Sequence, residues 1–288
     1  VIYLEDDLIV IITTDRLSVF DVVLPKGIPY KGQILIQISL HMLNLSKSIV
    51  PNWLIMSPDP IVSIGKRCKP FKVEMIIRGY LSGHAAREYK KGKRYISREK
   101  IPNNLNENDP FEIPKITPST KSDNGHDEDI SKEEILDKGL VSERDYEKME
   151  SYTNILFEEG SKIASERGLI LVDTKYEMGK DKDGNIILID EIHTPDSSRY
   201  WIADSYEERM EKQLEPQNID KEFLRLWFVD NCDPYNDETL PEAPEDLVLE
   251  LSSRYIYLYE TITGALFPFP NSEKSIYNRI NDNLKEVL

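Results

Sequence analysis

Cysteine is scarce in this sequence, with Cys68 and Cys232 the only two among 288 residues. Two cysteines are too few for a disulfide framework or a cysteine-built zinc site, and such usage is typical of a reducing compartment. The sequence also lacks any uninterrupted apolar run near the roughly 18 residues at which a segment becomes a candidate membrane-spanning helix. We therefore expect a cytoplasmic protein with no membrane partner.

Positive charge is in deficit, since 36 lysines and arginines face 52 aspartates and glutamates, a formal net charge of −16. Nucleic-acid binding depends on neutralising phosphates with Lys and Arg, so this balance argues against a nucleic-acid partner. A phosphate-bearing small molecule would instead need a local basic pocket. The length, with 40% hydrophobic residues, is enough for one large domain or two packed lobes.

Hydrophobic periodicity and capping residues predict a mixture of helices and strands. Strands are expected at 8–12, 22–24 and 70–78. Helices are expected at 33–48, 131–138, 142–167, 220–231, 247–262 and 271–287, with a capping box formed by Ser131 and Glu134.

The stretch from Gly168 to Trp201 carries the most specific pattern. Its apolar start, residues 169–172, predicts a buried strand. Asp173, Lys175 and Glu177 follow at two-residue spacing, which places them on one face of that strand. An Asp-Gly pair at 183–184 then predicts a tight hairpin leading into a second apolar run that ends at Asp190.

The hairpin predicts where these carboxylates meet. If Asp183 and Gly184 are the two turn residues, Glu177 lies directly opposite Asp190. Like charges in that position are destabilising, so a cation between them is expected, and Mg²⁺ is the natural one for oxygen ligands. Two alternatives remain open: a solvated hairpin tip whose carboxylates splay apart, and a bulge at Gly179 that breaks the register.

Two arginines extend the pattern. Arg199 ends a polar turn that begins at Thr194, and its planar guanidinium suits phosphate or carboxylate. Arg78 ends the apolar strand and is followed by Gly79. A charge in that position is costly unless it is paired, so it indicates a structural ion pair or a ligand.

Several segments together resemble the SAICAR synthetase family. They are DTKYEMG from Asp173, LIDEIHTPDSSRYW from Leu188, TDRLSVFD from Thr14, RGYLSGH from Arg78, and TPSTK from Thr117 with the HDED run from His126. They occur in the family's order over about Tyr3 to Gly264, which is nearly the whole chain.

The resemblance implies a ligase of de novo purine biosynthesis. It would join L-aspartate to the carboxylate of 5-aminoimidazole-4-carboxylate ribonucleotide (CAIR), giving SAICAR, ADP and phosphate through an acyl phosphate. The implied cofactors are ATP and Mg²⁺, the partners are CAIR, L-aspartate and ATP, and the assembly is a monomer or homodimer.

The implied fold is α+β and two-lobed, with an antiparallel N-terminal lobe, a larger α/β lobe and ATP in the cleft. Residues 1–77 would form the ATP-binding lobe and residues 78–264 the catalytic lobe with its C-terminal helices. Residues 265–288 are an extension to which we assign no function. The family's lysine- and glycine-containing phosphate-binding segment is expected upstream of Val1.

The implied site residues fall into four groups. Catalytic roles are expected for Asp173, Lys175 and Arg199. Metal ligands would be Asp173, Glu177 and Asp190, and nucleotide-binding residues would be Glu74, Met75, Lys121 and Lys175. Substrate-binding residues would be Asp15, Arg16, Arg78, Ser82, His84, Lys121, Asp196, Ser198 and Arg199, where His84 replaces a serine that many relatives carry.

Two other functions are compatible with parts of the pattern. Another ATP-dependent phosphotransferase acting on a small molecule would turn over ATP without aspartate. A non-catalytic acidic domain that binds Ca²⁺ at the hairpin would bind no ATP.

Overall fold

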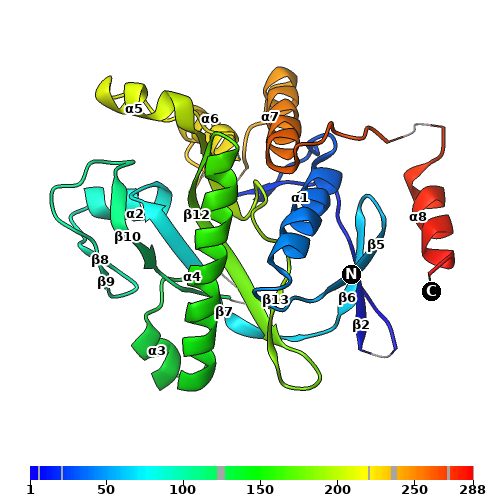
Figure 1. Cartoon of the computed structure of the whole chain (residues 1–288). Helices are drawn as coiled ribbons and strands as arrows, with labels where there is room; N and C mark the ends of the chain where they lie inside the picture. Colours follow the sequence, from blue (N-terminus) through cyan, green and yellow to red (C-terminus); the bar gives the residue numbers. More distant parts are fainter. Residues whose placement is uncertain are drawn as a thin grey trace.

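A computed structural model describes residues 1–5, 7–20, 22–121, 127–219, 221–234, 239–270 and 273–287. Two antiparallel sheets organise the chain, with helices packed on them (Figure 1). The predicted α+β class is therefore confirmed. Within these ranges no helix combines the length and the apolar character needed to cross a membrane.

The smaller sheet contains the N-terminal strands in the order β1 (Ile2–Tyr3), β2 (Leu8–Ile12), β6 (Val62–Lys66) and β5 (Leu54–Asp59). A short hairpin of β3 (Ser18–Val19) and β4 (Val22–Val23) follows β2. Alternation along β2 and β6 places Val10, Val62 and Ile64 on one face, where they form a small core against the C-terminal helix α8 (Ile276–Lys285). The two ends of the chain thus share one core.

The larger sheet is built around two strands of twelve residues each, β7 (Lys69–Tyr80) and β12 (Leu169–Lys180). They pair antiparallel from Asp173 opposite Arg78 to Lys180 opposite Lys69. Flanking them are β10 (Pro110–Ile116), β11 (Ser119–Thr120), β13 (Ile186–Ile189) and β14 (Ser198–Ile202). Helix α4 (Glu143–Glu166) packs along β12 and β7, as Figure 1 shows.

The predicted helices are confirmed to within a few residues at their ends. They are α1 (Lys31–Ser46), α3 (Lys132–Asp137), α4, α6 (Glu222–Asn231), α7 (Glu245–Thr263) and α8. The capping box is present, since Glu134 N–H donates to Ser131 Oγ at 3.2 Å and Ser131 N–H to the Glu134 carboxylate at 2.9 Å. The structure adds α2 (Gly83–Lys90), α5 (Ala203–Glu211) and the hairpin of β8 (Tyr95–Ile96) and β9 (Glu99–Lys100).

Parts of four predictions lie outside the described residues. These parts are Asp21 in the TDRLSVFD motif, residues 122–126 with His126 at the start of the HDED run, and the starts of the helices predicted at 220 and 271.

The predicted hairpin register is wrong by one residue. Glu177 pairs with Ile189, and Lys180 with Ile186, so Asp190 lies beyond the end of β13. The loop has three residues instead of two: Asp181 N–H bonds Asn185 O at 3.0 Å, and Gly184 takes a left-handed φ of 79°. Hairpin loops of this length place glycine in that conformation. The Asp181 carboxylate stabilises the loop by accepting the N–H groups of Asp183 and Asn185.

Helix α4 is locked to the loop after β13 by the ring of His193. Gly160 lies against this ring, and a Cβ at Gly160 would come within 2.7 Å of Nδ1. The ring is buried, and its Nε2 is 3.1 Å from Tyr176 Oη. Because a methyl group at position 160 would overlap this buried ring, α4 needs a glycine at this position.

We expect Gly160→Ala to lower the free energy of unfolding by about 1–3 kcal/mol through overpacking. Helix propensity alone predicts the opposite sign, a gain of roughly 1 kcal/mol. Urea unfolding of the variant measures the effect, with Ser151→Ala on the exposed side of α4 as the control. A more stable Gly160→Ala protein would contradict this packing.

Burial also lowers the pKa of His193 to about 4. The unfolded chain then takes up this proton as the pH falls below about 6.5, while the folded chain stays neutral until about pH 4. The contribution of His193 to stability is therefore complete above pH 6.5 and is lost as the pH falls toward 4, by about 3 kcal/mol in total.

We expect His193→Asn to flatten the dependence of unfolding free energy on pH between about 4 and 6.5. Asparagine tolerates the left-handed φ of 57° found here. The control Tyr176→Phe removes the hydroxyl but keeps the imidazole, so its slope should match that of the wild type. Parallel curves for His193→Asn and wild type would show that this histidine does not titrate with unfolding.

Candidate active site

One face of the β7–β12 pair presents charged side chains in register. Asp173 lies opposite Arg78, and Glu177 lies opposite Glu74, with Lys175 between the two pairs. The alternation that the sequence predicted for Asp173, Lys175 and Glu177 is thus confirmed. Charge of both signs is concentrated at the centre of the larger sheet.

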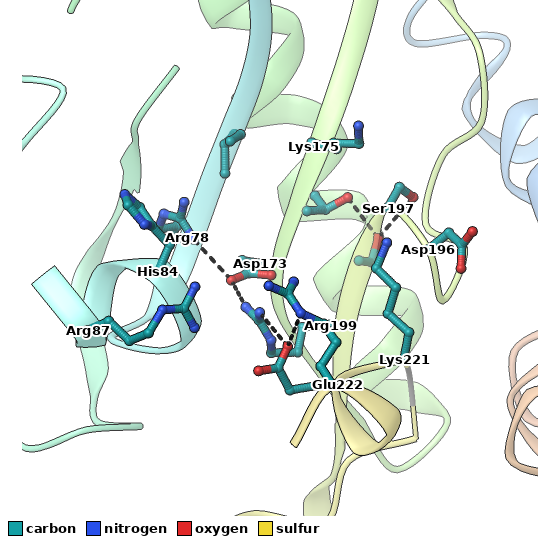
Figure 2. Close-up of a pocket in the computed structure, with 14 residues that line it drawn as sticks. Arg78, His84, Arg87, Asp173, Lys175, Asp196, Ser197, Arg199, Lys221 and Glu222 are labelled. Atoms are coloured by element: carbon teal, nitrogen blue, oxygen red, sulfur yellow. Dashed lines mark hydrogen bonds and ion pairs between the residues drawn. The ribbon is translucent and has the colours of Figure 1, made fainter. Parts of the chain in front are cut away.

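Asp173 is the shared counter-ion of two arginines. Its Oδ2 is 3.3 Å from Arg78 Nη1 and also bonds Arg199 Nη1 from β14, while Arg199 Nη2 reaches Glu222 on α6 at 3.2 Å. Figure 2 shows these four side chains as one connected series. Arg78 is almost completely buried, and burial lowers its pKa although Asp173 opposes the shift. Thr117 also accepts from Arg78 Nε at 2.9 Å.

A cavity of about 230 Å³ opens beside this series. Three carboxylates and six permanently cationic side chains line it, so it is a basic pocket in an acidic protein. The carboxylates are Asp173, Asp196 and Glu222, and the cations are Arg78, Arg87, Lys175, Arg199, Lys221 and Arg225. Ile76, His84, Thr174, Ser197 and Ser198 complete the lining, and Figure 2 shows Arg87 reaching toward the centre from α2.

Asp196 is held at the side of the pocket by two residues that lie behind it. Lys31 Nζ is 2.6 Å from its Oδ2, and Tyr255 Oη donates to its Oδ1 at 3.1 Å. Burial opposes the charge of Asp196, but Lys221, Lys31 and Tyr255 outweigh burial and lower its pKa. The carboxylate is therefore ionised and able to accept hydrogen bonds.

The other end of the charged face carries an acidic pair compensated by lysines. Lys175 Nζ is 2.8 Å from Glu74 Oε1, and Lys121 bonds Glu177. Burial opposes the charge of Lys175, but Glu74, Glu177 and Asp190 outweigh it and raise its pKa. The pairing of like charges across β7 and β12 is thus offset by two lysines that could also meet phosphate oxygens.

Comparison with known proteins identifies the family. The protein-family model described as SAICAR synthetase matches residues 1–241. The chain belongs to the SAICAR synthetase family.

Relatives of the SAICAR synthetase family match over nearly the full chain. A phosphoribosylaminoimidazole-succinocarboxamide synthase of Flavobacterium psychrophilum is 55% identical, covering 99% of this chain and 90% of the relative. The chloroplastic enzyme of Arabidopsis thaliana is 47% identical, covering 100% and 70%. Among solved structures, the SAICAR synthase of Saccharomyces cerevisiae complexed with SAICAR is 30% identical, with a TM-score of 0.78 and 92% of each chain covered.

The structure brings most of the predicted SAICAR synthetase site residues together. Those lining the cavity are Arg78, His84, Asp173, Lys175, Asp196, Ser198 and Arg199. Glu74, Lys121 and Glu177 adjoin them on the same charged face. His84 reaches the rim from α2, and its Nε2 is 2.8 Å from Asp129 Oδ2, which ties α2 to the acidic run.

The remaining five predicted residues neither line the cavity nor adjoin it on the charged face. Asp15 accepts Gly32 N–H at 2.9 Å near the start of α1, and Arg16 Nε donates to Thr14 Oγ1 at 3.1 Å on the surface. Ser82 is the N-cap residue of α2, and the Met75 side chain lies in the main hydrophobic core. Asp190 is exposed, and Trp53 Nε1 donates to its backbone carbonyl at 2.9 Å.

Sequence reasoning missed five charged residues of the site: Lys31, Arg87, Lys221, Glu222 and Arg225. Three of them share the start of α6, where Glu222 and Arg225 are one turn apart after Lys221. Arg87 lies one turn after Gly83 on α2, beside His84. The sequence signal that could have found them is the helical spacing of charged residues next to a recognised motif. That spacing alone does not distinguish residues that line a pocket from residues on a solvent-exposed helix face.

The carboxylates suit Mg²⁺ only in part. Glu177 and Asp190 offer hard oxygen donors near Lys175, although Lys121 pairs with Glu177, and Asp173 is occupied by two guanidinium groups. Within the described ranges, no three His, Cys, Asp or Glu side chains are placed to hold a metal ion. A Mg²⁺ ion needs only one or two protein carboxylates where phosphate and water fill the rest of its shell.

We expect Asp173→Asn to destabilise the ligand-free protein by on the order of 3 kcal/mol, since Arg78 and Arg199 lose their shared counter-ion. Added inorganic phosphate should recover part of this loss by binding the uncompensated arginines. Urea unfolding with and without phosphate tests both effects. Asp183→Asn, at the exposed hairpin loop, is the control and should change little. Equal stability of Asp173→Asn and wild type would contradict the role of Asp173.

Proposed function

We propose that the basic pocket beside β7, β12, β14 and α6 is where this SAICAR synthetase joins L-aspartate to CAIR. The observation that carries the proposal is the cluster of six cationic side chains around three carboxylates in a chain of net charge −16. The substrates are anions, so such a cluster collects them where the rest of the surface repels them. The relative complexed with SAICAR supports a ligand of this class.

The chemistry explains why ATP is needed. A carboxylate does not react with an amine at neutral pH because the leaving group would be oxide. Transfer of the γ-phosphoryl group from ATP to a CAIR carboxylate oxygen gives an acyl phosphate and ADP. The α-amine of L-aspartate then attacks the acyl carbon, phosphate departs with the bonding electron pair, and the nitrogen loses a proton. Positioning and charge stabilisation supply most of the rate of such steps.

We assign the anionic groups of CAIR to the arginine side of the pocket. Arg78 and Arg199 are presented by strands and fixed by Asp173, so their guanidinium groups are preorganised for carboxylate or phosphate. Arg87, Lys221 and Arg225 add charge from two helices. Asp196 and Ser198 supply the oxygen atoms that hydroxyl groups of a ribose require.

We assign ATP to the Glu74–Glu177 end of the charged face. In this assignment residues 1–77 form the ATP-binding lobe, residues 78–264 form the catalytic lobe, and ATP lies between them. Lys175 and Lys121 would meet its phosphates, and Glu74 and Met75 lie on the strand that borders the nucleotide. Glu177 and Asp190 would hold Mg²⁺, which supplies positive charge to the phosphate oxygens.

The direct test measures ADP release with CAIR, L-aspartate or ATP omitted in turn. We expect release only when all three are present. ADP release without aspartate would favour a different phosphotransferase, and failure to bind ATP would favour a non-catalytic domain.

A pair of variants on α2 tests the pocket itself. Arg87→Met should raise the KM for CAIR by about tenfold or more, because a charged hydrogen bond contributes about 1.5–3 kcal/mol. Lys90→Met removes the same charge from the same helix outside the cavity and should leave KM within about twofold. Steady-state ADP release at varied CAIR measures both. Equal KM values for the two variants would remove α2 from the site.

A further inference from the structure

The residues that hold Asp196 come from outside the segments that make up the pocket. We propose that Lys31 is a positioning residue for Asp196, and that the chain after α7 directs Lys31 into place. This inference rests on the proposed function, because it assumes that Asp196 contacts CAIR. It assigns a role to residues 265–270, which lie beyond the residues matched by the family model and are called the C-terminal strap below.

The Lys31–Asp196 pair has the geometry of a positioning contact. The side chain of Lys31 is only 5% exposed, so its ammonium group points inward and not to solvent. Its ammonium group pairs with one carboxylate oxygen of Asp196 at 2.6 Å, while the Tyr255 hydroxyl donates a hydrogen bond to the other at 3.1 Å. A carboxylate offers about four lone-pair positions, so about two remain for hydroxyl groups of a ligand. Lys31 and Tyr255 thus orient the acceptor without blocking it.

The direction of Lys31 depends on the residue before it. Tyr30 is the N-cap residue of α1 and has a left-handed φ of 64°. An aromatic residue rarely adopts that conformation, so its surroundings must hold it there. A relaxed Tyr30 would turn the start of α1 and withdraw Lys31 from Asp196.

The C-terminal strap supplies those surroundings. The ring of Tyr30 packs edge-on against Phe267 and Phe269, with centroids 5.7 and 5.4 Å away. Gln33, in the first turn of α1, donates to the carbonyl of Pro268 at 2.7 Å. The C-terminal strap therefore holds the start of α1 through two aromatic contacts and one hydrogen bond.

Both ends of the strap are anchored. It begins at the end of α7, and in Figure 1 it leads from α7 toward the side of the molecule where α8 lies. Helix α8 is fixed to the smaller sheet, where Arg279 Nε and Asn283 Nδ2 each donate to the buried Asp59 carboxylate at 2.8 Å. The C-terminal strap thus lies between α7 and α8 in the chain and contacts the start of α1, the helix that carries Lys31.

The first arm of the test separates positioning from general stability. Lys31→Met should raise the KM for CAIR by about tenfold while the KM for ATP stays within about twofold, and Lys31→Arg should recover most of the loss. Lys26→Met, at an exposed pair with Glu242, is the control and should change neither value. If Lys31→Met fails to fold in a thermal scan, Tyr255→Phe removes only the second hydrogen bond and should shift the same KM.

The second arm tests the strap. Phe269→Ala should raise the KM for CAIR in the same direction by about threefold or more, since Tyr30 loses one of its two ring contacts. Phe269 is 62% exposed, so the cost to the fold is small. Tyr277→Ala on α8, 77% exposed, is the matched control and should have no effect.

The outcomes distinguish this inference from the function on which it rests. Wild-type protein that does not release ADP with CAIR and aspartate overturns the proposed function and this inference together. Active wild type with an unchanged KM for CAIR in Lys31→Met or Tyr255→Phe overturns only the inference. An equal rise in the KM values for CAIR and ATP also overturns it, because a merely structural role would produce that pattern.

Discussion

The pairing of β7 with β12 is the constraint on which the rest of the molecule depends. It places Asp173 opposite Arg78 and Glu177 opposite Glu74, so that one face of a buried sheet carries charge of both signs. The opposite face packs Met75 and Tyr176 into the core. A shift of one residue would exchange the two faces, burying charge in the core and exposing apolar side chains. The core therefore secures the register, and the register places the charged site.

Charge compensation links the site to the surrounding elements. Asp173 pairs with arginines from β7 and β14, and Glu222 on α6 pairs with Arg199. Asp196, in the loop before β14, pairs with Lys31 of α1. Each buried charge has a partner on a different element, which offsets the cost of removing it from water. The same partners fix the cationic groups before any ligand arrives. A SAICAR synthetase that must gather several anions benefits from such preorganisation, because little ordering is left to the binding step.

Some of the site was predictable because it is local. The two-residue alternation of Asp173, Lys175 and Glu177 survives in any strand, and the capping box at Ser131 needs only four residues. The hairpin register was missed because the Asp181 carboxylate binds backbone N–H groups and stabilises a three-residue loop. The Asp-Gly pair does not distinguish that loop from a two-residue one. Arg87 and Lys221 were missed because a charge on a helix is equally compatible with solvent.

The sequence by itself determined the acidic balance, most of the described helices, the two central strands β7 and β12, the family and the group of residues around Asp173. These depend on residue type and short spacing, which the chain carries however it folds. Only the tertiary structure decided that Glu177 lies opposite Glu74 on β7 and opposite Ile189, not Asp190, on β13. It also decided that Lys31 reaches Asp196 from 165 positions away, and that the C-terminal strap holds Tyr30. The reason is physical: contacts between distant segments depend on how whole layers pack, and local propensity carries no information about those distances.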